Sequence, residues 1–214
     1  ETGAPEGEVV IAEHQSDGRG RLGRSWVSPP FSNLYCSLVL RPALAPAHAP
    51  QITLTAAVAL ADTVAAFVAE PPAIKWPNDI LLQGKKLAGI LTESSCDAKR
   101  IEFVILGIGV NLNSPRERMP ETIRDRATSL MEVGGQGVSR ENFLRRLIQD
   151  LDRCYGVLED FGFDAIAPRW QARFGLKGRT VRVEMGGDVL IGRALGIDHD
   201  GALLSVSGAL PLDL

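Results

Sequence analysis

Cysteine is scarce in this chain of 214 residues, which contains only three. Cys36, Cys96 and Cys154 are widely spaced and form no Cys-x-x-Cys pattern. This spacing fits buried thiols in a reducing cytosol better than a disulfide framework or a zinc site. The three histidines are equally scattered, so we expect no metal site built by the protein alone.

Long hydrophobic runs and a strong net charge are also lacking. No stretch is long and apolar enough to span a bilayer, and the first residues do not have the charged-then-apolar layout of a signal peptide. We therefore expect a cytoplasmic protein without a membrane partner. The formal net charge of −3 argues against a surface that coats nucleic acid, because such binding relies on many cations that neutralise phosphates.

Internal repeats and low-complexity tracts are absent as well. Apolar residues make up 45% of the chain and charged residues 23%, which is ordinary for a folded globular protein. A chain of this length fits one large domain, or one domain with a small satellite. The change in residue pattern along the sequence favours one domain with a small satellite.

The first three quarters of the chain alternate between strand and helix patterns. Helical spacing of apolar residues predicts one helix over 50–68 and another that opens at Ser139 and reaches Leu158. Apolar runs predict strands, of which we expect the first to be buried and the last to be buried on both faces: 9–12, 33–40, 80–82, 87–93 and 103–111. Residues 115–137 are polar and predict an irregular excursion.

Beyond Trp170 the sequence changes to short β-rich pieces separated by glycine turns. This pattern of short strands and turns predicts a small β-barrel. The domain boundary is expected between residues 171 and 177, which gives a first domain over 1–172 and a second over 173–214.

A loop rich in glycine and arginine follows the first predicted strand. Gly18-x-Gly20-x-x-Gly23 formally matches the dinucleotide fingerprint, but the segment 25–30 contains two prolines and cannot easily continue as the helix that this fingerprint opens. A Gly-Lys-Ser/Thr phosphate loop is absent. The loop is therefore expected to bind phosphate through Arg19, Arg21 and Arg24. The alternatives are a solvated basic loop or a nucleic-acid contact.

A second polar cluster ends the strand that follows the first helix. Lys75-Trp76-Pro77-Asn78-Asp79 combines a cation, an aromatic ring and a carboxylate, and Lys86 follows across a turn. Lys86 could neutralise an α-phosphate or a carboxylate, while Asp79 could order a lysine amine or a metal-bound water. The alternative is a Trp-Pro packing corner with surface lysines.

Taken together and in order, the motifs of this sequence resemble those of biotin protein ligases. The residues that carry the resemblance are Ala12-Glu13-His14-Gln15, Gly18-Arg19-Gly20-Arg21-x-Gly23-Arg24-x-Trp26, Lys75-Trp76-Pro77-Asn78-Asp79, Lys86-Leu87-Ala88-Gly89-Ile90-Leu91-x-Glu93 and Gly107-Ile108-Gly109-Val110-Asn111. The strong match spans about residues 9–113.

The resemblance implies an α+β fold, namely a mixed β-sheet with helices similar to class II aminoacyl-tRNA synthetases, followed by a small SH3-like β-barrel. It also implies an ATP-dependent ligase that joins biotin and MgATP into biotinyl-5′-AMP and transfers biotin to one lysine of a biotin carboxyl carrier protein. ATP, Mg²⁺ and biotin are the expected small molecules, with Mg²⁺ bound to ATP.

Carried over by position, the resemblance implies three overlapping groups of site residues. The catalytic group is Lys86, Arg21 and Asp79. The biotin-binding group is Gln15, Gly18, Arg19, Lys86, Gly89, Ile90, Gly107 and Val110. The group that binds ATP and the adenylate is Arg19, Arg21, Arg24, Trp26, Lys75, Asn78 and Asn111.

The sequence also departs from the family pattern. The upstream Ser/Thr-Ser-Thr-Asn segment of the biotin pocket does not precede Val9, and no N-terminal helix-turn-helix is found, so DNA is not an expected partner. A homodimer is left open, through a sheet edge or through the barrel. Two rival functions remain: a lipoate or octanoate transferase or ligase, and a nucleic-acid-binding or regulatory module.

Overall fold

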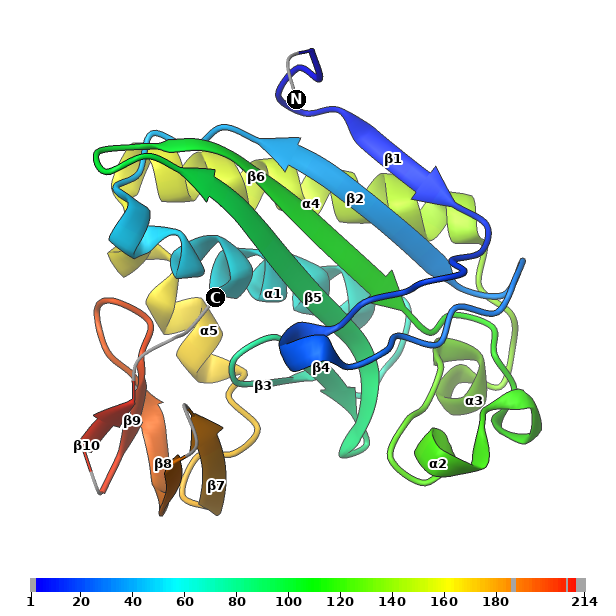
Figure 1. Ribbon diagram of the computed structural model, residues 1–214. Coiled ribbons are helices and arrows are strands. Elements are labelled where there is room, and N and C mark those ends of the chain that lie inside the picture. Colours follow the sequence, from blue (N-terminus) through cyan, green and yellow to red (C-terminus); the bar gives the residue numbers. More distant parts are fainter. Residues whose placement is uncertain (1–2, 186–187, 207, 211–214) are drawn as a thin grey trace.

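A six-stranded sheet forms the centre of the computed structural model, which describes residues 3–185, 188–206 and 208–210 (Figure 1). The strand order is β1-β2-β6-β5-β4-β3, and each neighbouring pair is antiparallel. The strands are β1 (Val9–Ala12), β2 (Leu34–Leu40), β3 (Ala73–Lys75), β4 (Asp79–Leu82), β5 (Lys85–Cys96) and β6 (Ile101–Val110).

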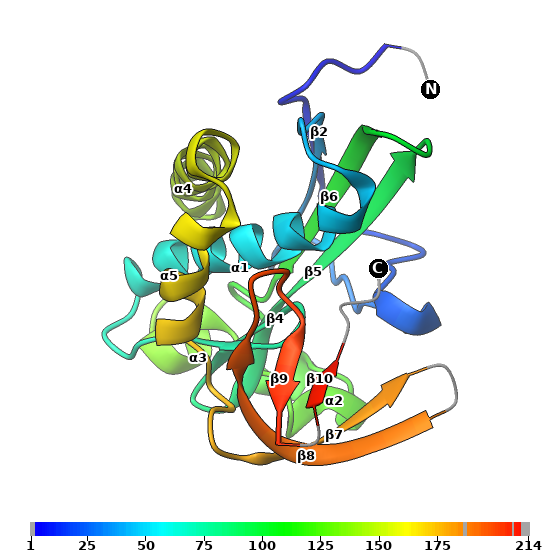
Figure 2. The same ribbon diagram turned by 90° about the vertical axis from the view of Figure 1, so that its left-hand side faces the viewer.

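The longer helices cover one face of this sheet and leave the other face to the loop after β1 (Figures 1 and 2). They are α1 (Pro50–Ala65), α4 (Arg140–Phe161) and α5 (Ala167–Ala172). Shorter helical turns are η1 (Arg21–Gly23), η2 (Pro46–His48), η3 (Arg116–Arg118), α2 (Glu121–Arg124), α3 (Leu130–Gly134) and η4 (Phe163–Ala165). The α2 and α3 turns lie inside the stretch predicted to be irregular.

Helix α1 is the middle layer, between the sheet and α4 (Figure 2). All but two of its 16 residues are buried, because small alanines let the sheet and α4 approach it from opposite sides. A helix buried on all sides needs no polar face. The predicted helix over 50–68 is therefore confirmed, although it ends at Ala65.

Helix α4 covers α1 with one apolar stripe. Ser139 caps its N-terminus by accepting a hydrogen bond from the Asn142 N–H at 3.2 Å, as the sequence predicts. Its one buried carboxylate, Asp150, accepts hydrogen bonds from the Thr63 hydroxyl at 2.9 Å and from Arg146 at 2.7 Å. These partners compensate the desolvation of the charge and join α4 to α1.

Three expectations from the sequence are wrong in detail. Strand β1 is an edge strand that pairs only with β2, so Val10 and Ile11 are exposed rather than buried. Strand β6 is fully buried on one face only, because its other face carries Gly107 and borders a cleft. Of the three cysteines, Cys96 is exposed.

A second, smaller sheet follows α5 and confirms the predicted change to β structure. Its order is β10-β9-β8-β7, and its strands are β7 (Thr180–Met185), β8 (Asp188–Ile197), β9 (Leu203–Ser205) and β10 (Gly208–Leu210). It lies beside α5 and β3 in Figure 1. Within the described residues, no helix has both the length and the apolar character needed to cross a membrane.

The packing of α4 on α1 generates a stability prediction. Leu147→Ala should destabilise the protein by about 2–5 kcal/mol, because this fully buried side chain would leave a cavity. Leu144→Ala is the matched control, since Leu144 is only partly buried and should lose less. Urea unfolding measures both; equal losses would contradict the stated role of the buried stripe.

Candidate active site

The loop after β1 folds into a hairpin over the open face of the sheet. Its two arms are joined by hydrogen bonds from the Gly20 N–H to the Arg24 carbonyl at 2.6 Å and from the Trp26 N–H to the Gly18 carbonyl at 2.7 Å. Gly18 has no room for a side chain, because a Cβ there would lie 2.5 Å from the Trp26 carbonyl oxygen. Glycine at this position therefore lets the arms close.

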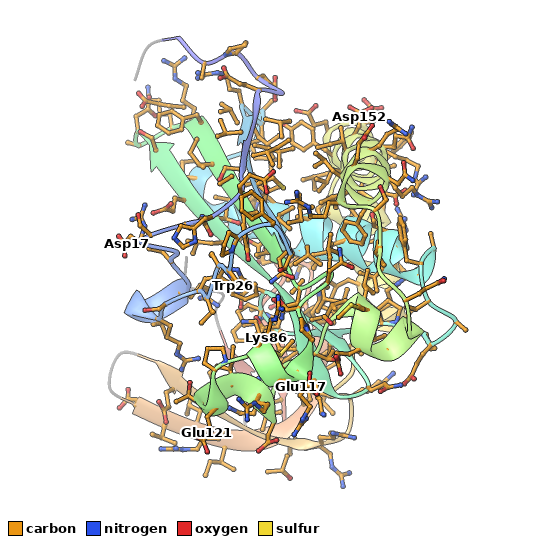
Figure 3. The ribbon with its side chains drawn as sticks, turned by 90° about the vertical axis from the view of Figure 1, so that its right-hand side faces the viewer. Asp17, Trp26, Lys86, Glu117, Glu121 and Asp152 are labelled. Carbon is orange, nitrogen blue, oxygen red and sulfur yellow. The ribbon has the colours of Figure 1, made fainter. Side chains whose placement is uncertain are left out.

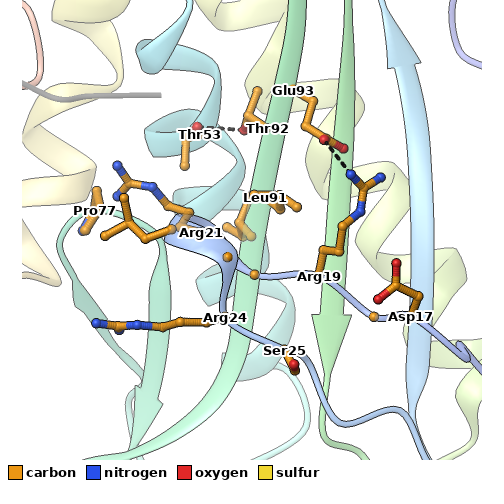
Figure 4. Close-up of a pocket in the computed structure, with 15 residues that line it drawn as sticks. Asp17, Arg19, Arg21, Arg24, Ser25, Thr53, Pro77, Leu91, Thr92 and Glu93 are labelled. Carbon is orange, nitrogen blue, oxygen red and sulfur yellow. Dashed lines mark hydrogen bonds and ion pairs between the residues drawn. The ribbon is translucent and has the colours of Figure 1, made fainter.

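The loop presents its arginines in different directions (Figure 4). Arg19 turns back to the sheet and forms an ion pair with Glu93 of β5 at 3.4 Å. Arg21 extends toward Pro77, and Arg24 also points away from Arg19. The loop thus spans from β5 to the segment after β3, with a cavity of about 460 Å³ beneath it.

A larger cleft of about 1050 Å³ joins this cavity. The loop forms one wall, β5 and β6 form the floor, and the β7–β8 hairpin of the small sheet contributes Arg182, Glu184, Asp188 and Val189. The cleft is thus shared by both sheets. Its size is close to the upper limit of small-molecule sites.

Lys86 and Asp79 are brought together by the β4–β5 hairpin, as their spacing in the sequence predicts. Lys86 Nζ lies 2.6 Å from Asp79 Oδ1, and the Lys86 side chain is 36% exposed. The Lys86 backbone is held from the opposite side, where its N–H donates to the Arg126 carbonyl at 2.7 Å. A paired but accessible cation therefore stands at the floor of the cleft.

Trp26 covers this cation. Lys86 Nζ lies 5.3 Å from the centre of the Trp26 ring, a cation–π distance, and both residues stand on the loop side of the sheet (Figure 3). A Cβ at Gly109 would come within 2.5 Å of the indole, and one at Gly89 within 3.1 Å. The indole needs both glycines, and its buried Nε1 has no hydrogen-bond partner in the described structure.

Polar contacts hold the two ends of the site in place. At the loop, the Ser28 hydroxyl donates to Gln15 Oε1 at 2.8 Å. At the floor, Asn78 Nδ2 donates to the Ile90 carbonyl at 2.7 Å, and the Ile90 N–H donates back to the Asn78 carbonyl at 3.0 Å. The segment before β4 is thereby tied to β5.

Cys36 also borders the cleft, but burial raises the pKa of its thiol to about 12. A thiol with that pKa remains protonated near neutral pH, and the thiolate is the reactive form. Cys36 is therefore a packing residue of the cleft wall. Its burial gives no support for covalent catalysis through cysteine.

Most residues that the sequence singled out meet at the cleft or the cavity beneath the loop. Those that do are Gln15, Gly18, Arg19, Arg21, Arg24, Trp26, Lys75, Asn78, Asp79, Lys86, Gly89, Ile90 and Gly107. Val110 and Asn111 do not line either space. Val110 is fully buried, and Asn111 Nδ2 donates to the Thr128 carbonyl at 3.1 Å, behind the floor.

Sequence reasoning did not select several residues that line the cleft or the cavity beneath the loop. Gly109 lies two positions after Gly107 on the same strand face, so the two-residue period of a strand could have identified it. Thr53 and Thr92, whose hydroxyl oxygens are 2.6 Å apart beneath the loop, could not be paired from the sequence. The same holds for Arg182 and Glu184, which approach from the second sheet.

The described residues contain no group of three or more histidine, cysteine, aspartate or glutamate side chains placed to hold a metal ion. A metal ion in this cleft would therefore take most of its ligands from a bound molecule such as a polyphosphate.

Comparison with known families gives two matches along the chain. Residues 1–111 match the biotin/lipoate A/B protein ligase family, and residues 177–204 match the biotin protein ligase C-terminal domain. Since β7 and β8 lie in the second region, the two matched parts meet at the cleft.

Individual relatives agree with these matches. The bifunctional ligase/repressor BirA of Bacillus spizizenii is 38% identical over 201 residues, which are 94% of this chain but 62% of the relative. The chain thus spans about three fifths of that protein's length. The biotin–acetyl-CoA-carboxylase ligase of Paracoccus denitrificans is 39% identical over 198 residues, which cover 91% of this chain and 82% of the relative.

A solved structure extends the likeness to the fold. Biotin protein ligase from Aquifex aeolicus, in complex with biotin and ATP, aligns with a TM-score of 0.85 at 28% identity and covers 99% of this chain and 88% of that chain. Motifs, cleft, matched regions and fold agree, and the chain belongs to the biotin/lipoate A/B protein ligase family.

Proposed function

We propose that this chain is an ATP-dependent biotin ligase, which forms biotinyl-5′-AMP and transfers the biotinyl group to one lysine of a biotin carboxyl carrier protein. The observation that carries the proposal is the Lys86 ammonium, which stands at the floor of one cleft beneath a loop with three arginines. The Paracoccus denitrificans relative, named as a biotin–acetyl-CoA-carboxylase ligase, supports biotin as the acid.

In the first step, a biotin carboxylate oxygen attacks the α-phosphorus of ATP, and the bond to the bridging oxygen breaks as pyrophosphate leaves. Lys86 is the cation beside the reacting carboxylate and phosphate, where negative charge must be stabilised. Arg21 neutralises phosphate charge from the loop side. Mg²⁺ brought in with ATP would neutralise negative charge on the leaving pyrophosphate.

In the second step, the amine of the carrier lysine attacks the acyl carbon, AMP leaves, and the amine loses a proton. Asp79 keeps Lys86 in position at 2.6 Å, and its carboxylate serves as the acceptor for that proton. A reactive acyl-adenylate must be shielded from water until the carrier arrives. The arginine loop, which already lies over the cavity, provides this cover.

The remaining site residues divide between the two substrates. Biotin binds against Gly89, Ile90 and Gly107 of the floor and against Gln15, Gly18 and Arg19 of the loop, and Val110 supports the floor from the core. The nucleotide binds on the side of the cleft that is lined by Arg19, Arg24, Trp26, Lys75 and Asn78. Asn111 supports it from behind, because its N–H donates to the Leu87 carbonyl, next to Lys86, at 3.0 Å.

We assign residues 1–172 to the catalytic domain and residues 173–214 to the C-terminal domain. Helix α5 ends at Ala172 and β7 begins at Thr180, so the assigned boundary lies in the connection between the two sheets. We place the reaction in the cytoplasm, where MgATP is available and the three free cysteines stay reduced.

A direct test mixes the protein with biotin, ATP and Mg²⁺ and measures pyrophosphate release, with lipoate as the control acid. Biotin-dependent release is expected. Release with lipoate alone would establish the rival assignment within the same family, and no release with either acid would refute the proposal. Transfer is then measured as biotin bound covalently to a carrier domain.

The position of Lys86 predicts a loss of adenylation on substitution. Lys86→Ala should lower the rate of pyrophosphate release by about 10²–10³-fold, because one charge-stabilising donor is removed. Lys85→Ala is the matched control: Lys85 is the neighbouring residue of β5 but does not line the cleft. Equal rates in the two variants would show that Lys86 has no role in the chemical step.

The arginine loop predicts a different defect. Arg21→Gly should still form biotinyl-AMP but release it about tenfold faster, since a charge-assisted contact to phosphate is lost. The measurement follows labelled adenylate in a rapid-filtration chase. Arg118→Gly, an exposed arginine of η3, is the control. An unchanged release rate for Arg21→Gly would rule out the retention role.

The glycine floor predicts a third defect. Gly109→Ala should raise the KM for ATP at least about tenfold, because the new Cβ displaces the indole that contributes to nucleotide binding. Gly156→Ala is the control, since a Cβ there meets nothing within 4 Å in α4 and alanine favours a helix. An unchanged KM for Gly109→Ala would remove Trp26 from the nucleotide site.

A further inference from the structure

Trp76 makes a contact that its place in the Lys75–Asp79 motif does not explain. Its indole Nε1 donates a hydrogen bond of 3.1 Å to the carbonyl of Gly201, which lies 125 residues further along the chain, between β8 and β9. The half-buried ring also packs against the hydrophobic core. One side chain thus joins the floor of the cleft to the second sheet.

The turn that receives this bond is held by hydrogen bonds and by close packing. Asp198 Oδ1 accepts hydrogen bonds from the N–H groups of Asp200 at 3.0 Å and Ala202 at 2.9 Å. Gly201 has a φ of +90°, and a Cβ there would lie 2.5 Å from Leu54 Cδ1. Only glycine fits this position without displacement, because both the backbone conformation and the packing on α1 exclude a side chain.

Both ends of the contact lead to the cleft. On one side, Trp76 is followed by Asn78, which is hydrogen-bonded to Ile90 of the floor, and by Asp79, which holds Lys86. On the other side, the turn continues backward into β8, whose far end carries Asp188 and Val189 in the cleft wall. A shift of the turn would therefore move this wall relative to Lys86.

We infer that Trp76 is a positioning residue that latches the second sheet to the catalytic floor through Gly201 and so sets the width of the cleft. A second hydrogen bond, from Gln171 Nε2 to the Ile197 carbonyl at 3.1 Å, closes the same interface at the beginning of the connection. The latch acts through geometry, since Trp76 donates its only hydrogen-bonding proton to Gly201 and not to the site.

The test uses Trp76→Phe, which keeps an aromatic ring and removes the N–H. Without ligands, native-state hydrogen exchange in β8 and β9 should become about fivefold faster, the effect of losing one hydrogen bond, while β5 and β6 stay unchanged. Trp170→Phe is the matched control, because the Trp170 Nε1 is buried without a partner in the described structure. It should not accelerate β8 and β9 selectively.

Gly201→Ala is a second variant that disturbs the same contact at the acceptor residue. It keeps the test valid if Trp76→Phe folds poorly. Gly201→Ala should accelerate exchange in the same strands, and adding Trp76→Phe should cause little further change, because displacement of the turn by the new Cβ already breaks the bond to Trp76.

Three outcomes would overturn the latch. The first is unchanged exchange in β8 and β9 for both single variants, and the second is acceleration that is equally large in β5 and β6. The third is a strictly additive effect in the double variant.

The consequence for the cleft rests on the proposed function and has its own readout. Trp76→Phe should raise the KM for ATP about fivefold and leave kcat within about twofold of the wild type. A loss of kcat with an unchanged KM would show that the latch does not set the width of the cleft. If the wild type itself releases no pyrophosphate, the proposed function fails, while the exchange experiment still decides the latch.

Discussion

The absence of side chains at Gly89 and Gly109 is the constraint on which the site depends. These adjacent positions of β5 and β6 are paired across the sheet, so together they leave a flat area of bare backbone. The Trp26 indole fills that area and covers Lys86. Because Trp26 also closes the second arm of the arginine loop, the position of the loop follows from two missing Cβ atoms.

The same constraint explains how one ammonium group can remain accessible and ordered. Lys86 is held by Asp79, by the face of the indole and by its own backbone, which pairs with the segment before α3. A charge with three supports loses little rotamer freedom when a substrate binds. Preorganisation of this kind is the main way in which a fixed cation can stabilise charge that develops during a reaction.

Local patterns in the sequence predicted most of the fold and the separate parts of the site. The helix at α1, the Ser139 cap, the β4–β5 hairpin and the pairing of Lys86 with Asp79 all depend on residues close in the chain. The exposure of β1 could not be predicted, because it depends on which strand ends the sheet. Asn111 lies in a matching motif, yet its side chain points behind the floor to Thr128, a partner that only the fold supplies.

The second sheet shows where sequence patterns stop being informative. Arg182 and Glu184 form an ion pair at 2.9 Å on the face of β7 that borders the cleft, but nothing in their spacing points to a site formed by β5 and β6. They reach the cleft from the second sheet, whose turn at Gly201 packs against Leu54 of α1, a contact between residues far apart in the chain that local spacing does not indicate. The cleft wall on the second sheet is therefore fixed relative to the Lys86 floor by contacts between the two sheets, such as the bond from Trp76 to Gly201, and not by strand pairing within the large sheet.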